Sequence, residues 1–162
     1  MSDKKAVMHQ PSDHEMVVRR TINAPRELVF AAWSDPKHLA HWFGPDGFTL
    51  TTHSMEFAVG GFWRFIMHGP DGTDFNNAIT YLEIDAPQRI VYKHAGEAGT
   101  EPVRFRNEVT FEVLGENLTR FTMHSIFDSP AALRFVIEHY QADKGGVQTT
   151  DRLAAYVEGW KA

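Results

Sequence analysis

The sequence predicts an α+β fold, in which a curved antiparallel sheet is closed by a long C-terminal helix. Two observations predict it. Between Phe48 and Phe127 apolar and polar residues alternate with a period of two, the pattern of strands that are covered on one face only. Before and after this stretch, apolar residues recur at helical spacing. Helices that are separated from the strands along the chain are typical of the α+β class.

The chain is expected to begin with a disordered tail over residues 1–13, which are polar, contain a proline and show no period. Residues 14–22 are rich in β-branched side chains and predict the first strand. Residues 14–162 are expected to form one domain, because no repeat or linker interrupts them. A chain of 162 residues is long enough to bury one sizeable core.

Two short helices are predicted after the first strand. Pro25 suits the first position of the first helix, because proline lacks only an N–H that would have no partner there. Asp35 is the predicted N-cap of the second helix, with Pro36 beside it, and Gly44-Pro45 ends this helix. The apolar faces of the pair are Val29, Ala32, Trp33, Leu39, Trp42 and Phe43.

Alternation predicts five more strands at 62–68, 74–85, 88–95, 104–114 and 118–127, so the sheet is expected to have about six or seven strands. Turn residues at 69–72 and 115–117 join neighbouring strands. The side chains expected to face the interior include Trp63, Phe65, Met67, Asn107, Phe111, Phe121, Met123 and Ser125.

The chain is predicted to end in two helices. Ser129-Pro130 begins the first of them, and Lys144-Gly145-Gly146 is expected to break it. Residues 147–160 are then expected to form one long helix, whose apolar stripe includes Leu153 and Val157. This stripe needs a partner, and the concave aromatic face of the sheet is the expected one.

Composition excludes several classes of function. A formal charge of −5 with scattered Lys and Arg disfavours nucleic-acid binding, which needs a concentrated basic surface. The absence of cysteine excludes disulfides and Cys-ligated zinc, and it suits a reducing compartment. The N-terminal residues lack the apolar run of a signal peptide, and no later run reaches membrane-spanning length. A cytoplasmic protein without membrane insertion is therefore expected.

Metal binding and catalysis find little support in the residue patterns. Among the nine histidines, His38 and His41 are three residues apart on the second predicted helix, but no acidic or cysteine ligand stands beside them in a standard pattern. The sequence contains no nucleophile elbow and no phosphate-binding glycine loop. We therefore expect no metal site, no cofactor and no catalytic residues.

Between residues 15 and 160, a series of short stretches resembles, in order, one known family. They are Ala24–Trp33, Asp35–Leu39, Trp42–Pro45, Gly60–Phe65, Gly69–Gly72, Tyr81–Ile84, Pro87–Tyr92, and Gly145–Leu153 with Tyr156. The family is the heat-shock-protein-90 ATPase activator homologue-like branch of the START-like (SRPBCC) superfamily. The resemblance implies a helix-grip fold with a deep apolar cavity, in which members bind lipids, sterols or polyketides, and some members are cyclases or other enzymes. The chaperone-stimulating N-terminal domain of the activator has no counterpart in this sequence, so the resemblance implies little about a chaperone partner.

The candidate ligand-binding residues are the inward face of the sheet and the helix side that faces it: Trp63, Phe65, Met67, Asn107, Phe111, Phe121, Met123, Ser125, Leu153, Tyr156 and Val157. Two interpretations stay open, a filled core and a ligand cavity. Asn107 and Ser125 favour the cavity, because buried polar groups need partners and the polar atom of a ligand or a trapped water would serve.

The leading functional hypothesis is non-catalytic binding of a small hydrophobic molecule. One alternative is a protein-interaction or co-chaperone-like module with an unidentified partner, which an exposed apolar patch near Trp42 and Phe43 would favour. The second alternative is a cyclase- or hydrolase-type enzyme, which would need a titratable residue inside the cavity.

Overall fold

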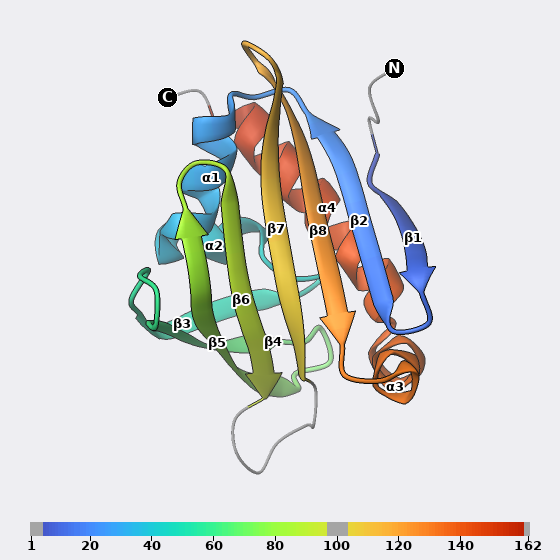
Figure 1. Ribbon diagram of the computed structural model, residues 1–162. Helices are drawn as coiled ribbons and strands as arrows, with labels where there is room; N and C mark the ends of the chain where they lie inside the picture. Colours follow the sequence, from blue (N-terminus) through green and yellow to red (C-terminus); the bar gives the residue numbers. More distant parts are fainter. Residues whose placement is uncertain (1–4, 97–103, 161–162) are drawn as a thin grey trace.

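The computed structural model describes residues 5–96 and 104–160 of the chain. Within these residues, eight strands form one antiparallel sheet in the order β1-β2-β8-β7-β6-β5-β4-β3 (Figure 1). The strands are β1 Val7–Ser12, β2 Glu15–Ile22, β3 Thr49–Met55, β4 Phe62–His68, β5 Asp74–Asp85, β6 Arg89–Gly96, β7 Arg104–Gly115 and β8 Leu118–Phe127. The helices are α1 Arg26–Ser34, α2 Pro36–Trp42, α3 Pro130–Tyr140 and α4 Ala142–Gly159.

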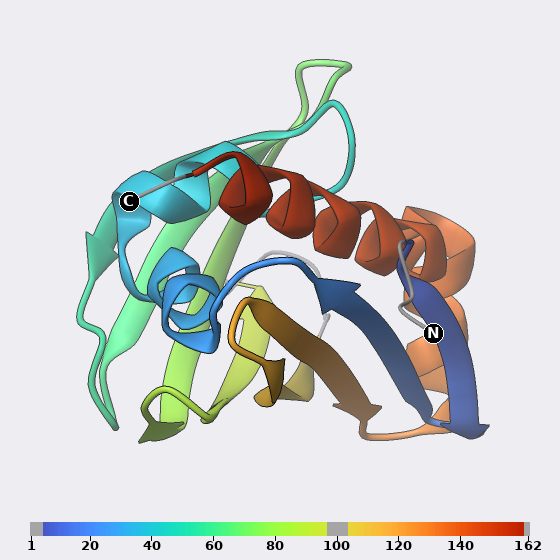
Figure 2. The same cartoon turned by 90° about the horizontal axis from the view of Figure 1, so that it is seen from above.

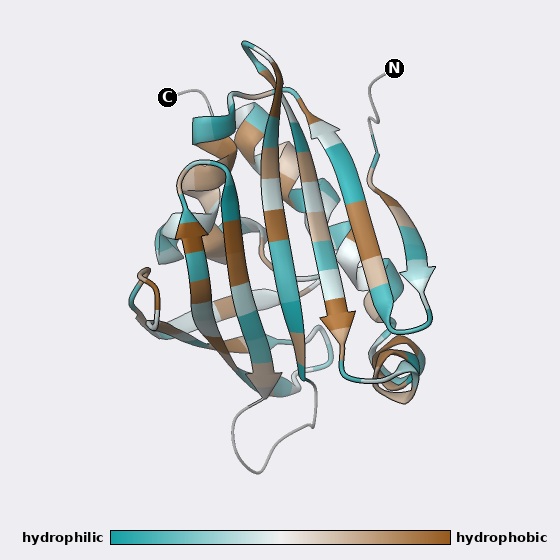
Figure 3. Ribbon diagram, viewed as in Figure 1, coloured by the Kyte–Doolittle hydropathy of each residue, from teal (hydrophilic) through white to brown (hydrophobic). Residues whose placement is uncertain are grey.

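The sheet curves around the long C-terminal helix. Figure 2 shows α4 lying across the concave side of the sheet, with α1 and α2 at one end of this groove and α3 near the other. This arrangement is the helix-grip fold, and it confirms the α+β class, the helix pair after the first long strand and the position of the last helix. Buried and less buried residues alternate strictly along β8, and Figure 3 shows hydrophobic and hydrophilic bands along β7 and β8.

The predicted strand number was too low, because both edge strands were missed. β1 occupies most of the segment expected to be a disordered tail, and it pairs with β2, with Met8 opposite Val18. Its side chains are mainly exposed, so it carries little of the hydrophobic alternation that reveals a half-buried strand. Pro11 is tolerated because one side of an edge strand needs no N–H donor. The first four residues of the predicted tail lie outside the described residues.

The start of the last helix also differs from the prediction. The break lies at Gln141, which adopts a left-handed conformation with φ of 53°, and α4 runs through Gly145 and Gly146. These glycines serve close packing: a Cβ added at Gly145 would lie 3.2 Å from Cγ of Pro45, and one added at Gly146 would lie 3.2 Å from Cγ2 of Val18. The helix end predicted at 144–146 is therefore wrong, because both glycines lie inside α4.

The predicted helix starts are confirmed at two positions. The carboxylate of Asp35 accepts a 2.8 Å hydrogen bond from the backbone N–H of Lys37 at the start of α2. Ser129 accepts a 3.1 Å bond from the N–H of Ala132 at the start of α3. Both caps satisfy backbone donors that have no partner within the helix, and both are followed by the predicted proline.

The interior of the fold contains two separate hydrophobic clusters. The larger joins the sheet to α1, α2 and the second half of α4, and its fully buried side chains include Trp42, Trp63 and Leu153. The smaller cluster is formed by Met16, Phe127, Leu133 and Val136, where α3 covers the far end of β2 and β8. The first half of α4 spans the distance between these two clusters.

Candidate ligand cavity

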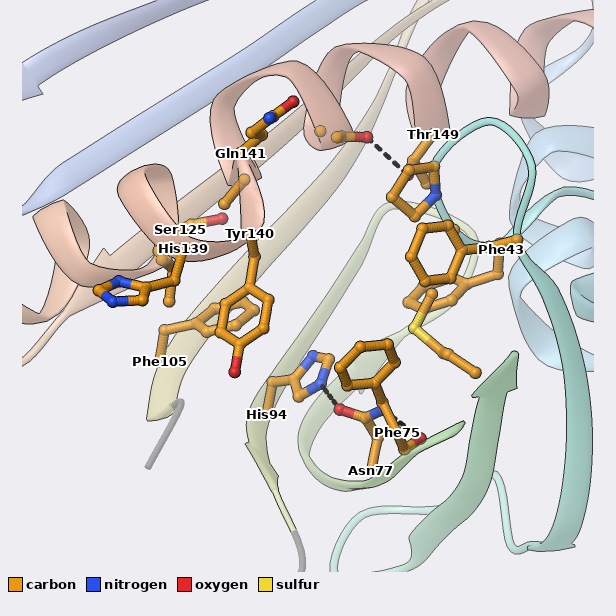
Figure 4. Close-up of a pocket in the computed structure, with 18 of the residues that line it drawn as sticks. Phe43, Phe75, Asn77, His94, Phe105, Ser125, His139, Tyr140, Gln141 and Thr149 are labelled. Carbon is orange, nitrogen blue, oxygen red and sulfur yellow. Dashed lines mark hydrogen bonds between the residues drawn. The ribbon is translucent and has the colours of Figure 1, made fainter. Parts of the chain in front are cut away.

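A cavity of about 930 Å³ lies between the two hydrophobic clusters. Its upper wall is the end of α3 and the first half of α4, and its lower wall is the sheet from β4 to β8 (Figure 4). The aromatic side chains around it are Phe43, Phe48, Phe75, Tyr92, Phe105, Phe127 and Tyr140. In Figure 4, Tyr140 descends from the helical wall toward Phe75 and His94 of the sheet. The exposed residues Pro70, Asp71 and Gln141 lie at the rim.

The size of the side chains along α4 explains why the interior is filled at one end and open at the other. The residues of its first half that line the cavity are all small: Ala142, Gly145, Gly146 and Thr149. They share one face of the helix, since they are spaced three, four and seven residues from Ala142. One turn later, Leu153 and Val157 continue the inward face with large side chains, and both are buried in the larger cluster. The change from small to large residues therefore sets the boundary between cavity and core.

A row of four cross-strand neighbours runs along this boundary on the sheet. Met16, Ser125, Asn107 and Tyr92 pair in that order from β2 through β8 and β7 to β6, and all four line the cavity. The Ser125 hydroxyl donates a 2.7 Å hydrogen bond to Oδ1 of Asn107, and Nδ2 of Asn107 donates a 2.6 Å bond to the Tyr92 hydroxyl. These three side chains are at most 4% exposed, so the row is a buried polar network within an apolar wall.

The ionisation of Tyr92 is set by its burial. Burial raises the pKa of Tyr92 above its ordinary value of 10, and the hydrogen bond from Asn107 offsets only part of this effect. The phenol therefore stays protonated across the physiological range. It contributes a hydroxyl, not a charge, to the cavity.

His94 follows two residues later on the same strand and also lines the cavity. Its Nε2–H donates a 2.9 Å hydrogen bond to Oδ1 of Asn77, whose amide is held in turn by the carbonyl of Phe75. The ring lies 4.9 Å from that of Phe105 and 6.1 Å from that of Phe65. Burial lowers the pKa of His94 to about 4, so the imidazole is neutral at pH 7. With its N–H on Nε2, the neutral ring keeps Nδ1 as an acceptor.

Charged groups around the cavity are confined to its mouth. Asp71 and Asp74 are exposed residues at the rim, and Asp74 lies 2.7 Å from Nδ1 of His68. Within the described residues, no lysine or arginine lines the cavity. The described lining thus has two carboxylates and the exposed His139 toward its opening and no lysine or arginine inside.

Four of the eleven predicted ligand-binding residues line this cavity: Met67, Asn107, Met123 and Ser125. Six others pack in the larger cluster instead, where they are at most 2% exposed: Trp63, Phe65, Phe111, Phe121, Leu153 and Val157. The rings of Trp63 and Phe65 stack on each other at 3.9 Å, and α1, α2 and α4 cover this part of the sheet. The filled core therefore accounts for most of the aromatic face of the sheet.

Tyr156 lies outside the cavity, between α2 and α4. Its hydroxyl is 2.7 Å from Nδ1 of His38, and its ring stacks against that of His41 at 5.3 Å. His38 and His41, whose spacing raised the question of a metal site, thus both contact Tyr156. The described residues contain no group of three or more His, Cys, Asp or Glu side chains that could hold a metal ion.

Asn107 and Ser125 were predicted to face inward, and they do. They form hydrogen bonds with each other, and Asn107 also bonds to Tyr92. Sequence reasoning missed Tyr92 and His94, although their alternation along β6 puts them on one face. The register that sets Tyr92 opposite Asn107 gave no signal in the sequence.

Comparison with known proteins places the fold. Solved structures with the same fold include the solution structure of a protein from Arthrobacter aurescens, which is 28% identical over 94% of this chain and 91% of that chain, with a TM-score of 0.85. A crystal structure of a protein from Mycobacterium smegmatis is 20% identical over 97% and 99% of the two chains, with a TM-score of 0.82. A protein from Silicibacter pomeroyi named AHSA1 is 18% identical over 89% and 97%, with a TM-score of 0.68. These last two likenesses show the fold alone.

No curated protein sequence matches the chain at a significant level. None of the helices in 5–96 and 104–160 has the length and apolar character needed to cross a membrane. The sequence model of one family, Activator of Hsp90 ATPase homolog 1-like protein, matches residues 23–158. This family and the helix-grip fold support a binding or co-chaperone-like module. The match covers strands β3 to β8 and the four helices as far as residue 158, whereas β1 and β2 precede it, and the chain belongs to the Activator of Hsp90 ATPase homolog 1-like protein family.

Proposed function

We propose that this chain is a non-catalytic binder of a small hydrophobic molecule, which occupies the cavity between the sheet, α3 and the first half of α4. The observation that carries the proposal is the cavity itself. Its volume of about 930 Å³ falls at the upper end of the range typical of small-molecule sites. Its wall combines apolar and aromatic side chains with a small number of converging polar groups, which is the composition typical of such sites.

Burial of apolar surface would supply most of the affinity. The rings of Phe43, Phe75 and Phe105 surround the space from three directions (Figure 4). Each Å² of apolar ligand surface removed from water contributes roughly 25 cal/mol, before the cost of association is subtracted. An apolar ligand is therefore the natural occupant, and we expect it to be bound in the cytoplasm.

The interaction-module alternative loses the feature that would have favoured it. An exposed apolar patch near Trp42 and Phe43 would have favoured this alternative, but these residues are 0% and 8% exposed. Their rings pack against each other at 5.5 Å and against Trp33. A cavity thus supports ligand binding more directly than this surface supports a protein partner.

One observation favours catalysis as a second candidate. Two titratable side chains, Tyr92 and His94, line the cavity and lie two residues apart on β6. A neutral imidazole with Nδ1 as an acceptor can take a proton, and a buried phenol can donate a hydrogen bond to a carbonyl oxygen. The second candidate is therefore a cyclase- or hydrolase-type enzyme that uses the same cavity.

The test of ligand binding compares two tryptophan substitutions of similar added volume. Both residues belong to the larger cluster, but Met123 also lines the cavity, whereas Leu153 is fully buried and does not line it. Leucine and methionine are close in volume, so Met123→Trp and Leu153→Trp add about the same bulk. Binding of the fluorescent neutral dye Nile red is measured for both variants and the parent protein, together with urea unfolding.

The parent protein should bind Nile red. Met123→Trp should remain folded with little loss of stability and should lose most of the dye binding, because the indole fills the cavity. Leu153→Trp should be destabilised by about 1–3 kcal/mol or more, because a packed core does not accept the extra volume. If the parent protein binds neither Nile red nor any member of a broad screen of neutral lipophilic compounds, ligand binding is wrong.

A further inference from the structure

The polar network on the cavity wall has a fixed direction of hydrogen-bond donation. Ser125 donates to Oδ1 of Asn107, and Asn107 donates through Nδ2 to the Tyr92 oxygen. In this arrangement the acceptor end of the Asn107 amide faces Ser125, and its donor end faces Tyr92. The Tyr92 oxygen is thus an acceptor within the network, and its own proton is directed elsewhere.

The Tyr92 hydroxyl has no acceptor among the residues that the structure describes. Its side chain is 1% exposed and lines the cavity. A buried hydroxyl without an acceptor is costly, and most buried polar groups in proteins are paired. The cavity therefore offers one strong, preorganised hydrogen-bond donor to whatever occupies it.

The charge around the cavity restricts the occupant further. A carboxylate needs a cation or several donors to compensate for its removal from water. The lining that the structure describes has neither lysine nor arginine, and Asp71 and Asp74 stand at the mouth. The imidazole of His94 is neutral and donates its Nε2–H to Asn77, so it supplies no compensating charge. An anion would meet repulsion at the entrance and no countercharge inside.

We infer that the ligand is a neutral molecule with a hydrogen-bond acceptor, such as a ketone, ester or ether oxygen, and that Tyr92 donates a hydrogen bond to this atom. Ser125 and Asn107 are positioning residues, since they orient the tyrosine hydroxyl without touching the ligand oxygen. This inference rests on the proposed function and adds the chemical class of the ligand. It excludes the anionic form of fatty acids, although their apolar chains would suit the cavity.

Three probes with one ring system and nearly equal size test the inference: 2-acetylnaphthalene, 2-ethylnaphthalene and 2-naphthoate. They present a neutral acceptor, no acceptor and an anion. Dissociation constants are measured at pH 7.5 by displacement of Nile red or by calorimetry. The ketone should bind about two- to tenfold more tightly than the hydrocarbon, as expected for one net hydrogen bond. The carboxylate should bind at least about tenfold more weakly than the ketone.

Two variants assign the effect to the network. Tyr92→Phe should lower the affinity for the ketone to that for the hydrocarbon and leave the affinity for the hydrocarbon unchanged. Ser125→Ala should also lower the affinity for the ketone, although Tyr92 is still present. Without the serine hydroxyl, the Asn107 amide can turn its oxygen toward Tyr92 and accept the hydroxyl proton, which is then not available to the ligand. If Tyr92→Phe is too unstable to purify, Ser125→Ala still tests the inference, since it leaves Tyr92 and its hydroxyl unchanged.

The outcomes separate the inference from the proposed function. If none of the three probes and no Nile red binds, both fail together. If the probes bind but 2-naphthoate is as tight as 2-acetylnaphthalene, the cavity binds ligands and the assignment of their class is wrong. Equal binding of ketone and hydrocarbon to the parent protein would also overturn the role of Tyr92.

Discussion

The hydroxyl of Tyr156 lies 2.7 Å from Nδ1 of His38, and this contact joins the last turns of α4 to α2. The ring of Trp160 covers the other side of His38, with ring centroids 4.2 Å apart. Burial raises the pKa of Tyr156 above its ordinary value, and the negative charge of Asp35 raises it further. The group is thus a neutral hydrogen-bonding partner that holds two helices together, at the opposite end of α4 from the cavity.

Loss of this hydroxyl should weaken the fold without affecting the cavity. Tyr156→Phe removes one hydrogen bond between partly buried groups and should lower the free energy of unfolding by about 0.5–1.5 kcal/mol. Binding of Nile red should not change, because Tyr156 does not line the cavity. Urea unfolding and dye titration of the same preparation check both parts. A loss of dye binding with unchanged stability would contradict this assignment and return Tyr156 to the ligand site.

The same aspartate placed on two faces of α4 should have very different effects. Leu153 is fully buried, whereas Ala155 is exposed two residues further along the helix. Leu153→Asp puts a carboxyl group into the larger cluster and should destabilise the protein by more than about 4 kcal/mol or prevent folding. Ala155→Asp costs only helix propensity, less than about 1 kcal/mol. Thermal unfolding decides the matter, and similar melting temperatures for both variants would show that the helix faces are wrongly assigned.

Much of the fold could be predicted because its signals are local. Alternation along β7 and β8 placed Asn107 and Ser125 on the inner face, and helical spacing placed Leu153 in the core. The caps Asp35 and Ser129 could be recognised because each forms its bond within three residues along the chain. Such features depend on neighbours in sequence, and tertiary contacts leave them unchanged.

The features that were missed depend on contacts between distant segments. β1 and β3 are held by backbone pairing at the sheet edges, so their side chains show little periodicity. The helix break at Gln141 could not be predicted, because no glycine or proline marks it in the sequence. Gly145 and Gly146 fit against Pro45 and Val18, which are more than 90 residues away in sequence, and the same glycines read locally suggest a break.

One feature of the sequence indicates where the cavity lies, although it was not part of the prediction. The small residues Ala142, Gly145 and Thr149 share the face of α4 that later carries Leu153. A helix face that changes from small to large residues predicts either close packing or open space beneath the small ones. Only the structure decides between the two, because the answer depends on how far the sheet curves away from the helix.

The loop before β4 gives a third prediction, which rests on a close backbone approach. A Cβ added at Gly61 would collide with the carbonyl oxygen of Glu56 and would lie 2.9 Å from that of Ala58. Backbone atoms cannot swing away as a side chain can, so Gly61→Ala should destabilise the protein by about 1–3 kcal/mol. Gly159→Ala is the control, since an added Cβ there meets no atom within 4 Å. If the two variants unfold at the same urea concentration, the tight turn at Gly61 is wrong.

The last prediction concerns acid and His94. Burial lowers the pKa of this imidazole from an ordinary value of 6.5 to about 4 in the folded protein. Between these pH values the unfolded chain binds a proton at His94 that the folded protein does not bind. The free energy of unfolding therefore rises with pH across this window and is lost as the pH falls from 6.5 toward 4.

Between pH 7 and 4.5 this loss should amount to about 1–2 kcal/mol, with allowance for the partly exposed ring. The pKa of Glu15 is lowered from 4.5 by hydrogen bonds from Ser12 and His124, so Glu15 also contributes to the loss near pH 4.5, but it does so equally in the parent protein and in a His94 variant. His94→Gln keeps a hydrogen-bond donor but has no proton to gain, so its stability should fall less over the same range. Urea unfolding of both proteins at several pH values measures the difference. Parallel curves for the two proteins would show that His94 ionises as freely in the folded state as in the unfolded chain, and the neutral interior assigned to the cavity would then be wrong.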